Sequence, residues 1–258
     1  MNLGEVLYDN LARQAGATIA WSGETLPSFP PRNALDWRDF SVWRITEPGV
    51  LEVTLLIGGA VDSWALWTRT NNGLAATATL QLELSAGVFT TVDSPIILAV
   101  GSSALVMRRL TQSYSLAAGR KVRLVIGGAS SLDVRQFAFG ERLTFEVGQY
   151  GGIKPPTLLH GVVVTNVIAT NGSIIGRSIR REERSGEISL QPVTREWVRT
   201  SWEPFALHAS RYAFFYLWNP TEYPDEACFA VAENINAPEN VSPVPRMKVT
   251  MPLRILAD

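Results

Sequence analysis

Phe29 to Ile45 reads FPPRNALDWRDFSVWRI, and this stretch of the chain indicates the fold. It begins with a proline pair. Because proline fixes φ and disfavours helix in the residue before it, we expect an ordered loop rather than a helix. Three large aromatic residues follow, Trp37, Phe40 and Trp43. Each ring can bury roughly 150–250 Å², so the loop is suited to plugging one end of a β-sandwich.

The sequence after this loop, from residue 49 to residue 141, has the pattern of short strands. The clearest is 79–85, where leucines at every second position alternate with Gln81 and Glu83. This period of two is typical of a half-buried strand. Further candidates follow at close spacing, separated by Gly, Ser or Asn, with no long helix between them. We therefore expect a mainly β fold, an antiparallel sandwich or jelly roll.

From residue 144 onward the sequence changes character, since ten of the fifteen prolines lie beyond this point. The pair Asn171-Gly172 predicts a type I′ hairpin between a strand at 158–169 and its partner at 173–181. A turn at 182–186 and another strand at 187–191 are expected next. We place the domain boundary here: residues 1–143 form a jelly-roll domain with an N-terminal arm, and residues 144–258 form a second β-rich domain.

The second domain is predicted to contain one short helix. Apolar residues between 194 and 208 recur near the helical period, and Thr194 is a suitable N-cap. The tail from residue 236 is proline-rich and is expected to be extended. Its last part, 246–256, alternates well enough to close a sheet edge.

Composition excludes several classes of function. The 258 residues carry a formal net charge of -1, which gives no bulk attraction to nucleic acid or to an anionic membrane. The apolar runs are shorter than the roughly 20 residues that span a bilayer. The N-terminus lacks the pattern of a secretory signal, so we expect synthesis in the cytoplasm. A single cysteine, Cys228, excludes an internal disulfide and is expected to be a small buried hydrophobe.

No catalytic motif of a hydrolase, nucleotide-binding protein or zinc enzyme is present. His160 and His208 are 48 positions apart and, with one cysteine, make a poor metal set. We therefore expect no enzyme activity, no metal and no cofactor. A glycoside hydrolase needs only two carboxylates, and Asp36 and Asp39 flank Trp37. The simpler interpretation is that Asp36 caps a turn while Asp39 pairs with a neighbouring arginine.

The run RSIRREER at 177–184 mixes four arginines with two glutamates. A nucleic-acid patch would lack those acids. Two interpretations remain equal: a solvated hairpin with cross-strand ion pairs, or a salt-bridge surface between subunits. The candidate assembly residues lie on this hairpin and in the C-terminal tail: Asn171, Arg177, Arg180, Arg181, Arg184, Pro243 and Pro245.

Residues 17–143 resemble the galactose-binding-like (discoidin-type) jelly roll. The loop 29–43 precedes a strand at 51–57, a strand-turn-strand unit spans 80–92, and a late strand at 121–126 leads into a closing strand at 132–139. The acidic-glycine pair of that family's loop is replaced here by Asp36-Trp37. The sequence thus departs from the pattern of the family's calcium site.

The whole arrangement is similar to tail-tip or baseplate proteins of tailed bacteriophages. In the second half, a hairpin over 164–181, a helix and an aromatic strand ending in Trp218-Asn219-Pro220 carry this resemblance. It implies a distal-tail-type structural protein of the virion tail, made in the host cytoplasm. The protein would form a ring, a trimer or hexamer, that joins the tail tube to hub or receptor-binding proteins.

The alternative function is that of a carbohydrate-binding module that contacts host surface glycans. It assigns the aromatic residues of the 29–45 loop to a stacking platform and the charged residues to polar contacts. The candidate glycan contacts are Trp37, Arg38, Asp39, Phe40, Trp43 and Arg44.

Overall fold

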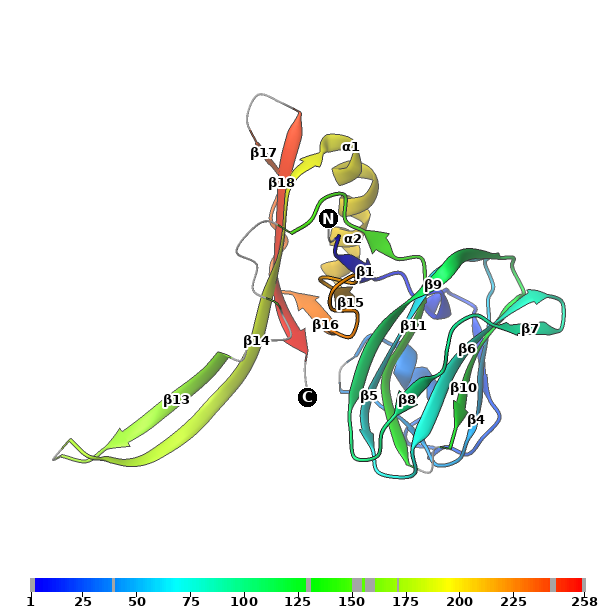
Figure 1. The fold of residues 1–258 in the computed structure, drawn as a ribbon, viewed down its shortest axis with the longest axis horizontal. Coiled ribbons are helices and arrows are strands. Elements are labelled where there is room, and N and C mark those ends of the chain that lie inside the picture. Colours follow the sequence, from blue (N-terminus) through cyan, green and yellow to red (C-terminus); the bar gives the residue numbers. More distant parts are fainter. Residues whose placement is uncertain are drawn as a thin grey trace.

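The computed structural model describes residues 3–38, 40–128, 131–149, 155, 161–170, 172–241 and 245–256, with the backbone alone described at 70, 161–165 and 179–184. The described chain is mainly β, with one longer helical segment over residues 195–209 (Figure 1). Two short 3-10 helices are also present, η1 (Leu11–Arg13) and η2 (Pro31–Leu35), and η2 lies in the 29–45 loop, where no helix was expected. The strands form three antiparallel sheets, and the expected fold class is confirmed.

Two of these sheets form a sandwich. The outer sheet has the order β2 (Thr18–Trp21), β4 (Gly49–Thr54), β10 (Lys121–Gly127), β6 (Ala76–Ser85) and β7 (Val88–Thr91), with β8 (Ile96–Leu98) also paired to β6. The middle sheet has the order β3 (Trp43–Ile45), β11 (Leu132–Gly140), β5 (Gly59–Asn71) and β9 (Ala104–Leu116). Consecutive strands from β3 to β6, and again from β9 to β11, alternate between the two sheets. This winding is that of a jelly roll.

The third sheet belongs to the second half of the chain, with one exception. Its order is β12 (Leu143–Thr144), β1 (Glu5–Leu7), β15 (Phe214–Leu217), β16 (Ala227–Ala232), β18 (Arg246–Leu256), β14 (Ile174–Thr194) and β13 (Gly161–Ile168), with β17 (Glu239–Asn240) beside β18. Strand β1 comes from the N-terminal arm and pairs with both β12 and β15. This corrects the expected domain limits, because the jelly roll is inserted between β1 and β12.

The middle sheet is buried on both faces over most of β5 and β11, which explains why these two strands show no alternation of apolar and polar residues. In β5, Trp64 and Leu66 point into the sandwich core, whereas Ala65 and Trp67 point the other way. The second face packs against the third sheet. We call this contact the seam; its buried members are Leu7, Trp37, Ala65, Trp67, Met107, Ala138, Ala213, Phe215, Leu217, Ala227 and Phe229.

The opposite face of the third sheet is covered by the helical segment. It comprises α1 (Arg195–Trp197), a π-helical turn over Val198–Trp202 and α2 (Glu203–Ala209). The predicted cap is confirmed, because the Thr194 hydroxyl accepts a hydrogen bond from the Trp197 amide at 3.2 Å. Trp202 and Phe205 are buried against this face of the sheet. The molecule therefore has four layers: outer sheet, middle sheet, third sheet and helix.

Two expectations for the second half need correction. The expected turn at 182–186 does not form, because β14 runs without interruption through 174–194 and changes its partner from β13 to β18. Strand β18 was expected at a sheet edge but lies between β16 and β14. Both corrections follow from the pairing of β14: the run at 177–184 is strand rather than turn, and the strand continues beyond it as the neighbour of β18.

His208, on α2, lies at one end of the seam among the rings of Tyr8, Trp37 and Tyr212. Its Nε2 atom is buried and has no hydrogen-bond partner among the described residues. Burial lowers the pKa of His208 from its ordinary value of 6.5, the Arg13 charge lowers it further, and the Ala213 backbone and Asp9 act in the opposite direction. The folded protein therefore favours the neutral imidazole.

Acidification is expected to destabilise the protein through this histidine. Between pH 6.5 and the lower pKa of the folded state, the unfolded chain binds more protons than the folded chain, so the free energy of unfolding falls as pH falls. His208→Phe removes this term. Denaturant titrations from pH 7.5 to 5 should therefore show a shallower loss of stability in the variant than in the wild type. Parallel curves would contradict a buried neutral His208.

Candidate functional site

The glycan platform expected on the 29–45 loop is not formed as predicted. Trp37 and Trp43 are 5% and 0% exposed, so neither ring can stack on a sugar, and this part of the prediction is wrong. Trp43 lies in the sandwich core, edge-on to Trp21. Phe40 is 77% exposed, and Asp39 lies outside the described residues.

Arg38 and Arg44, the described charged members of the same set, interact with carboxylates of the jelly-roll half. Arg44 binds both carboxylate oxygens of Asp133, with its Nε and Nη2 atoms at 2.6 and 2.7 Å. Arg38 is largely exposed and lies 4.0 Å from Asp36. The Asp36 carboxylate accepts hydrogen bonds from the Arg38 amide and the Ser41 hydroxyl, which is the turn-capping role that the sequence suggested.

Trp37 is buried because it faces the third sheet. Its ring stacks on Phe229, with 5.7 Å between centroids and 12° between planes. The backbone at Trp37 has φ of 61°, a left-handed conformation that is costly for a bulky residue. Gln136 holds this conformation: its Oε1 accepts from the Trp37 amide at 3.2 Å, and its Nε2 donates to the Arg38 carbonyl at 2.6 Å.

The described residues contain no group of three or more His, Cys, Asp or Glu side chains that is placed to hold a metal ion. No helix among the described residues is long and apolar enough to cross a membrane. Cys228 is buried as expected, and burial raises the pKa of its thiol far above the ordinary value.

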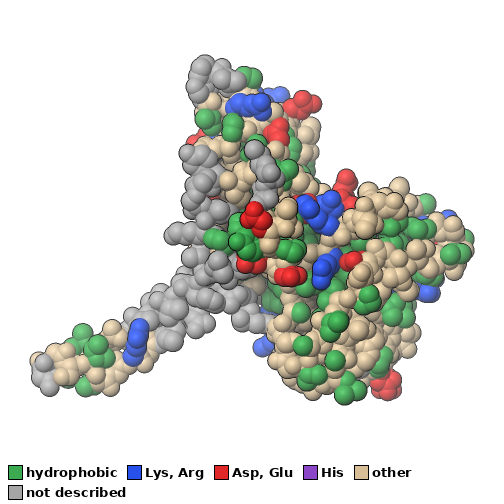
Figure 2. Space-filling view, viewed as in Figure 1, with side chains coloured by type: hydrophobic (Ala, Val, Ile, Leu, Met, Phe, Trp, Pro, Cys, Tyr) green, Lys and Arg blue, Asp and Glu red, His purple; other side chains and the backbone are tan. Residues whose placement is uncertain are grey.

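The most prominent feature of the second half is a two-stranded ribbon that projects from the body of the molecule (Figure 1). It consists of β13 and residues 174–183 of β14, and we call it the arm. Among the described strands, β13 pairs with β14 alone, so its outer edge is open. Figure 2 shows the arm extending away from both the jelly roll and the third sheet.

The outer end of the arm is apolar. The arm tip consists of Val167, Ile168, Ile174 and Ile175, whose exposed fractions range from 52% to 68%. Ile168 and Ile174 are directly opposite each other in the pairing, and Ile175 is the extra residue of a bulge. A two-stranded ribbon alone is at best marginally stable in water, and exposed apolar clusters commonly mark interaction sites. The arm therefore has the properties of a segment that packs against another chain.

The candidate assembly residues are only partly described. Arg177 is exposed on the arm, opposite Asn166, and Pro245 is exposed at the start of the C-terminal strand. Asn171 and Pro243 lie outside the described residues, as do the side chains of Arg180, Arg181 and Arg184. The apolar tip was missed by the sequence argument, which considered the charges of this hairpin and not the hydrophobic residues beside its turn.

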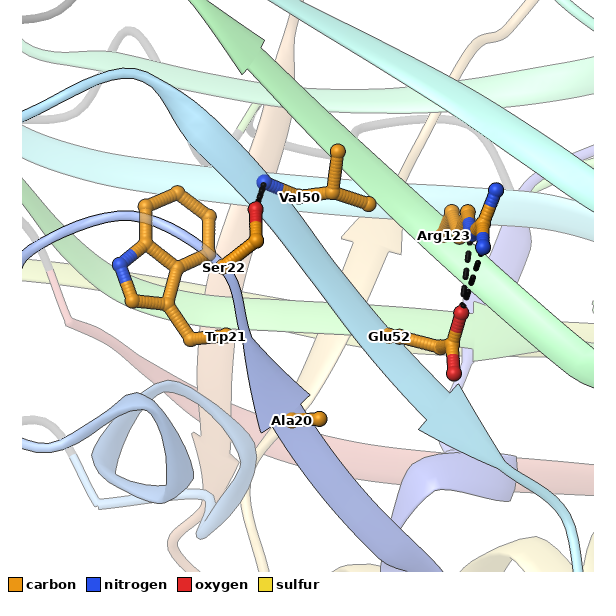
Figure 3. A pocket seen from close by; sticks show the side chains of 6 residues that line it. All are labelled: Ala20, Trp21, Ser22, Val50, Glu52 and Arg123. Carbon is orange, nitrogen blue, oxygen red and sulfur yellow. Dashed lines mark hydrogen bonds and ion pairs between the residues drawn. The ribbon is translucent and has the colours of Figure 1, made fainter.

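A second candidate site lies on the exposed face of the outer sheet. Here a hollow of about 370 Å³ is lined by Ala20, Trp21, Ser22, Val50, Glu52 and Arg123 (Figure 3). We call it the sheet hollow. Three adjacent strands supply it, β2, β4 and β10, and their register places Ala20, Glu52 and Arg123 in one row across the sheet. Sequence reasoning missed this site because Ala20 and Arg123 are about a hundred positions apart and only strand pairing joins them.

The two charged side chains that line the sheet hollow, Glu52 and Arg123, are held in place by ion pairs. The Glu52 carboxylate accepts from Lys121 Nζ at 2.6 Å and from Arg123 Nη2 at 2.8 Å. A hydrogen bond from Lys121 is the main cause that lowers the pKa of Glu52, with a further contribution from Arg123. The Arg123 guanidinium carbon also lies 3.3 Å from the centroid of the Phe89 ring. Glu52 is therefore an ionised acceptor at neutral pH.

The strand pairing shows that the N-terminal half is a two-sheet jelly roll, as expected. No protein-family model and no curated protein matches the chain. Among solved structures, the chain is similar to the CBM32-1 module from a family 31 glycoside hydrolase of Clostridium perfringens, with 16% identity, a TM-score of 0.42, and coverage of 52% of this chain and 99% of that one.

Two further similar structures are also carbohydrate-binding modules. One is chitosan-binding module 1 of a chitosanase/glucanase from Paenibacillus sp. IK-5, with 20% identity, a TM-score of 0.41, and coverage of 52% of this chain and 99% of that one. The other is the family 32 module of C. perfringens NanJ in complex with galactose, with 16% identity, a TM-score of 0.41, and coverage of 54% and 99%. At these identities no ligand carries over to this chain.

Proposed function

We propose that the protein is a structural subunit that assembles by packing its arm against a neighbouring copy. The observation that carries this proposal is the arm tip, four aliphatic side chains exposed at the end of a ribbon that has an open edge. Burying such side chains contributes roughly 1.5–3 kcal/mol each. A contact between the arm of one subunit and the body of the next is heterologous, and repeated contacts of this kind form a ring when the rotation between subunits closes.

The resemblance of the second half to tail-tip and baseplate proteins suggests which assembly this is. We infer a ring, trimeric or hexameric, in the virion tail of a tailed bacteriophage, where it links the tail tube to hub or receptor-binding proteins. The low net charge and the many apolar surface residues suit a protein that is largely covered by other subunits. The proposal assigns no reaction and no cofactor to the chain.

Charges placed at the arm tip should abolish assembly. In the Ile168→Asp/Ile175→Asp double variant we expect the dissociation constant to rise at least a hundred-fold, which corresponds to about 3 kcal/mol of lost burial. Native mass spectrometry and sedimentation velocity over a range of concentrations give the stoichiometry. Both positions are exposed in the single chain, so the folded subunit should keep its stability.

The matched control is Ile97→Asp, which places the same charge at an isoleucine that is 77% exposed on β8 of the jelly roll. It should assemble like the wild type. A wild-type chain that stays monomeric at all concentrations, or a double variant that still forms the wild-type ring, would contradict the proposal. Deletion of residues 236–258 is not a clean test, because it removes β18 from the middle of the third sheet.

A further inference from the structure

We propose that a hollow beside the helical segment binds an acidic, extended peptide segment of a partner protein. The hollow has a volume of about 430 Å³, and we call it the helix hollow. The helical segment lines it with Arg195, Val198, Arg199 and Glu203, and the facing strands β17 and β18 line it with Asn240 and Met247. This inference goes beyond assembly through the arm, because the helix hollow shares no residue with the arm.

The charged residues of the helix hollow face it together because the helical segment contains a π-helical turn. In an uninterrupted α-helix, residues 195 and 203 would lie about 80° apart around the axis. Here the Glu203 amide donates to the Val198 carbonyl, five residues earlier. The extra residue in this turn rotates Glu203 back to the side of the helix that carries Arg195 and Arg199. Turns of this kind occur frequently at functional sites.

Pro204 gives a physical reason for the wide turn. Proline has no amide hydrogen, and in a regular α-helix its ring would clash with the carbonyl four residues earlier. A wider turn just before Pro204 avoids this clash. The sequence of the helical segment therefore accounts for the row of charges that lines the helix hollow.

Two guanidinium groups supply hydrogen-bond donors to the helix hollow. Arg199 is exposed and makes no hydrogen bond or ion pair with another described residue. Arg195 donates from Nη2 to Asn240 Oδ1 at 3.0 Å, which joins the helical segment to β17. Its other N–H groups have no hydrogen bond to another described residue. Because a guanidinium presents its donors as a planar fork, it matches the two oxygens of a carboxylate.

The rest of the lining distinguishes a peptide from other anions. Glu203 is exposed and places a carboxylate in the same hollow, so it repels a polyanion that has no donors of its own. A peptide carries backbone N–H donors beside its acidic side chains, and these donors pair with Glu203 while the acid pairs with Arg199. Val198 is buried and Met247 half-buried, and both offer apolar surface to the aliphatic atoms of a peptide. The lining therefore fits an acidic peptide better than a phosphodiester chain.

The position of the helix hollow suits a contact with another protein. In Figure 1, α1 and β17 lie at one end of the third sheet, away from both the arm and the jelly roll. The arm of a subunit can therefore engage a neighbouring copy without covering that subunit's own helix hollow.

Nuclear magnetic resonance titration of the full-length protein tests the proposal. The probe is the peptide acetyl-Ala-Glu-Ala-Glu-Ala-amide, and an analogue with glutamine in place of glutamate removes its charges. Sodium phosphate and a thymidine pentanucleotide report on a general anion effect and on nucleic acid. We expect the acidic peptide to bind with a Kd on the order of 1 mM, with saturable shifts of the amides of residues 195–203, 240 and 247. The glutamine analogue should bind at least ten-fold more weakly.

Two variants locate the binding. Arg199→Gln removes one guanidinium from the helix hollow and should weaken binding of the acidic peptide at least ten-fold. Arg211→Gln is the matched control, because Arg211 is exposed just beyond the same helical segment but does not line the hollow. It should bind within two-fold of the wild type. The arm-tip variant Ile168→Asp/Ile175→Asp should also keep peptide binding, which separates this inference from assembly through the arm.

Several results would overturn the proposal. The first is an acidic peptide that gives no saturable shifts up to about 50 mM, and the second is a glutamine analogue that binds equally well. An Arg199→Gln variant that binds as the wild type does would also overturn it. Tighter binding of the pentanucleotide or of phosphate than of the peptide would assign the helix hollow to nucleic acid or to anions in general.

Discussion

Glu5→Gln should lower the free energy of unfolding by about 3–5 kcal/mol, the cost of breaking a buried ion pair by removing one partner. Glu5 is 0% exposed. Its carboxylate accepts from Arg109 at 2.6 and 2.7 Å, from Arg142 Nε at 2.9 Å and from the Thr144 hydroxyl at 3.1 Å. The amide cannot accept all of these hydrogen bonds. Arg142 keeps Asp62 as a second partner at 3.3 Å, whereas Arg109 loses the carboxylate that it binds.

The matched control is Glu52→Gln, which removes a carboxylate that also binds two cations but lies on the free face of the outer sheet. The Glu52 side chain is 20% exposed, and its partners Lys121 and Arg123 are 38% and 32% exposed. Pairs of this kind contribute about 0–1 kcal/mol. Chemical denaturation of both variants measures the difference. Equal losses would mean that burial of Glu5 does not set the strength of its network.

Trp37→Ala should have a similarly large effect, about 3–5 kcal/mol, because it opens a cavity in the seam. The ring contacts Phe215, Phe229 and His208, which all belong to the second half of the chain. Phe40→Ala, three positions further along the same loop and 77% exposed, should change stability by less than about 0.5 kcal/mol. Thermal and denaturant unfolding of the two variants gives the comparison.

The Trp37→Gly variant distinguishes the stability lost through the cavity from the stability lost through backbone strain at residue 37. Glycine leaves the same cavity but adopts a φ of 61° without steric cost. Alanine at a position with positive φ is strained. We therefore expect the glycine variant to be more stable than the alanine variant, by about 1 kcal/mol, which reverses the usual order of these residues. The usual order would show that the left-handed conformation at residue 37 is lost in the variants.

The jelly-roll strands could be predicted from sequence wherever one face of a sheet is buried and the other is free. Strand β6 follows this rule: Leu80 and Leu82 are fully buried, as their period of two indicates. The pattern fails only at its end. Leu84 is 40% exposed while Glu83 is buried, because the register shifts between Glu83 and Ser85. A bulge is set by how two strands pair, and the sequence of one strand alone does not show that pairing.

The arrangement of the second half could not be predicted, because it depends on contacts between distant segments. Nothing local shows that Glu5 to Leu7 pair with 215–217, or that Arg246 to Leu256 lie inside a sheet. The burial of Trp37 has the same origin. An aromatic residue in a loop beside charged neighbours looks like a surface residue until a second sheet covers it. The sheet hollow likewise exists only through the register of three strands.

Strand β14 has a mechanical consequence. It is one uninterrupted polypeptide segment, with its first half in the arm and its second half hydrogen-bonded along β18 in the middle of the third sheet. Antiparallel hydrogen bonds run perpendicular to the strands, so tension along β14 acts on all of those bonds in shear at once. A pull on the arm is therefore delivered to the interior of the subunit rather than to a flexible connector, and the arm behaves as a tether anchored in the core.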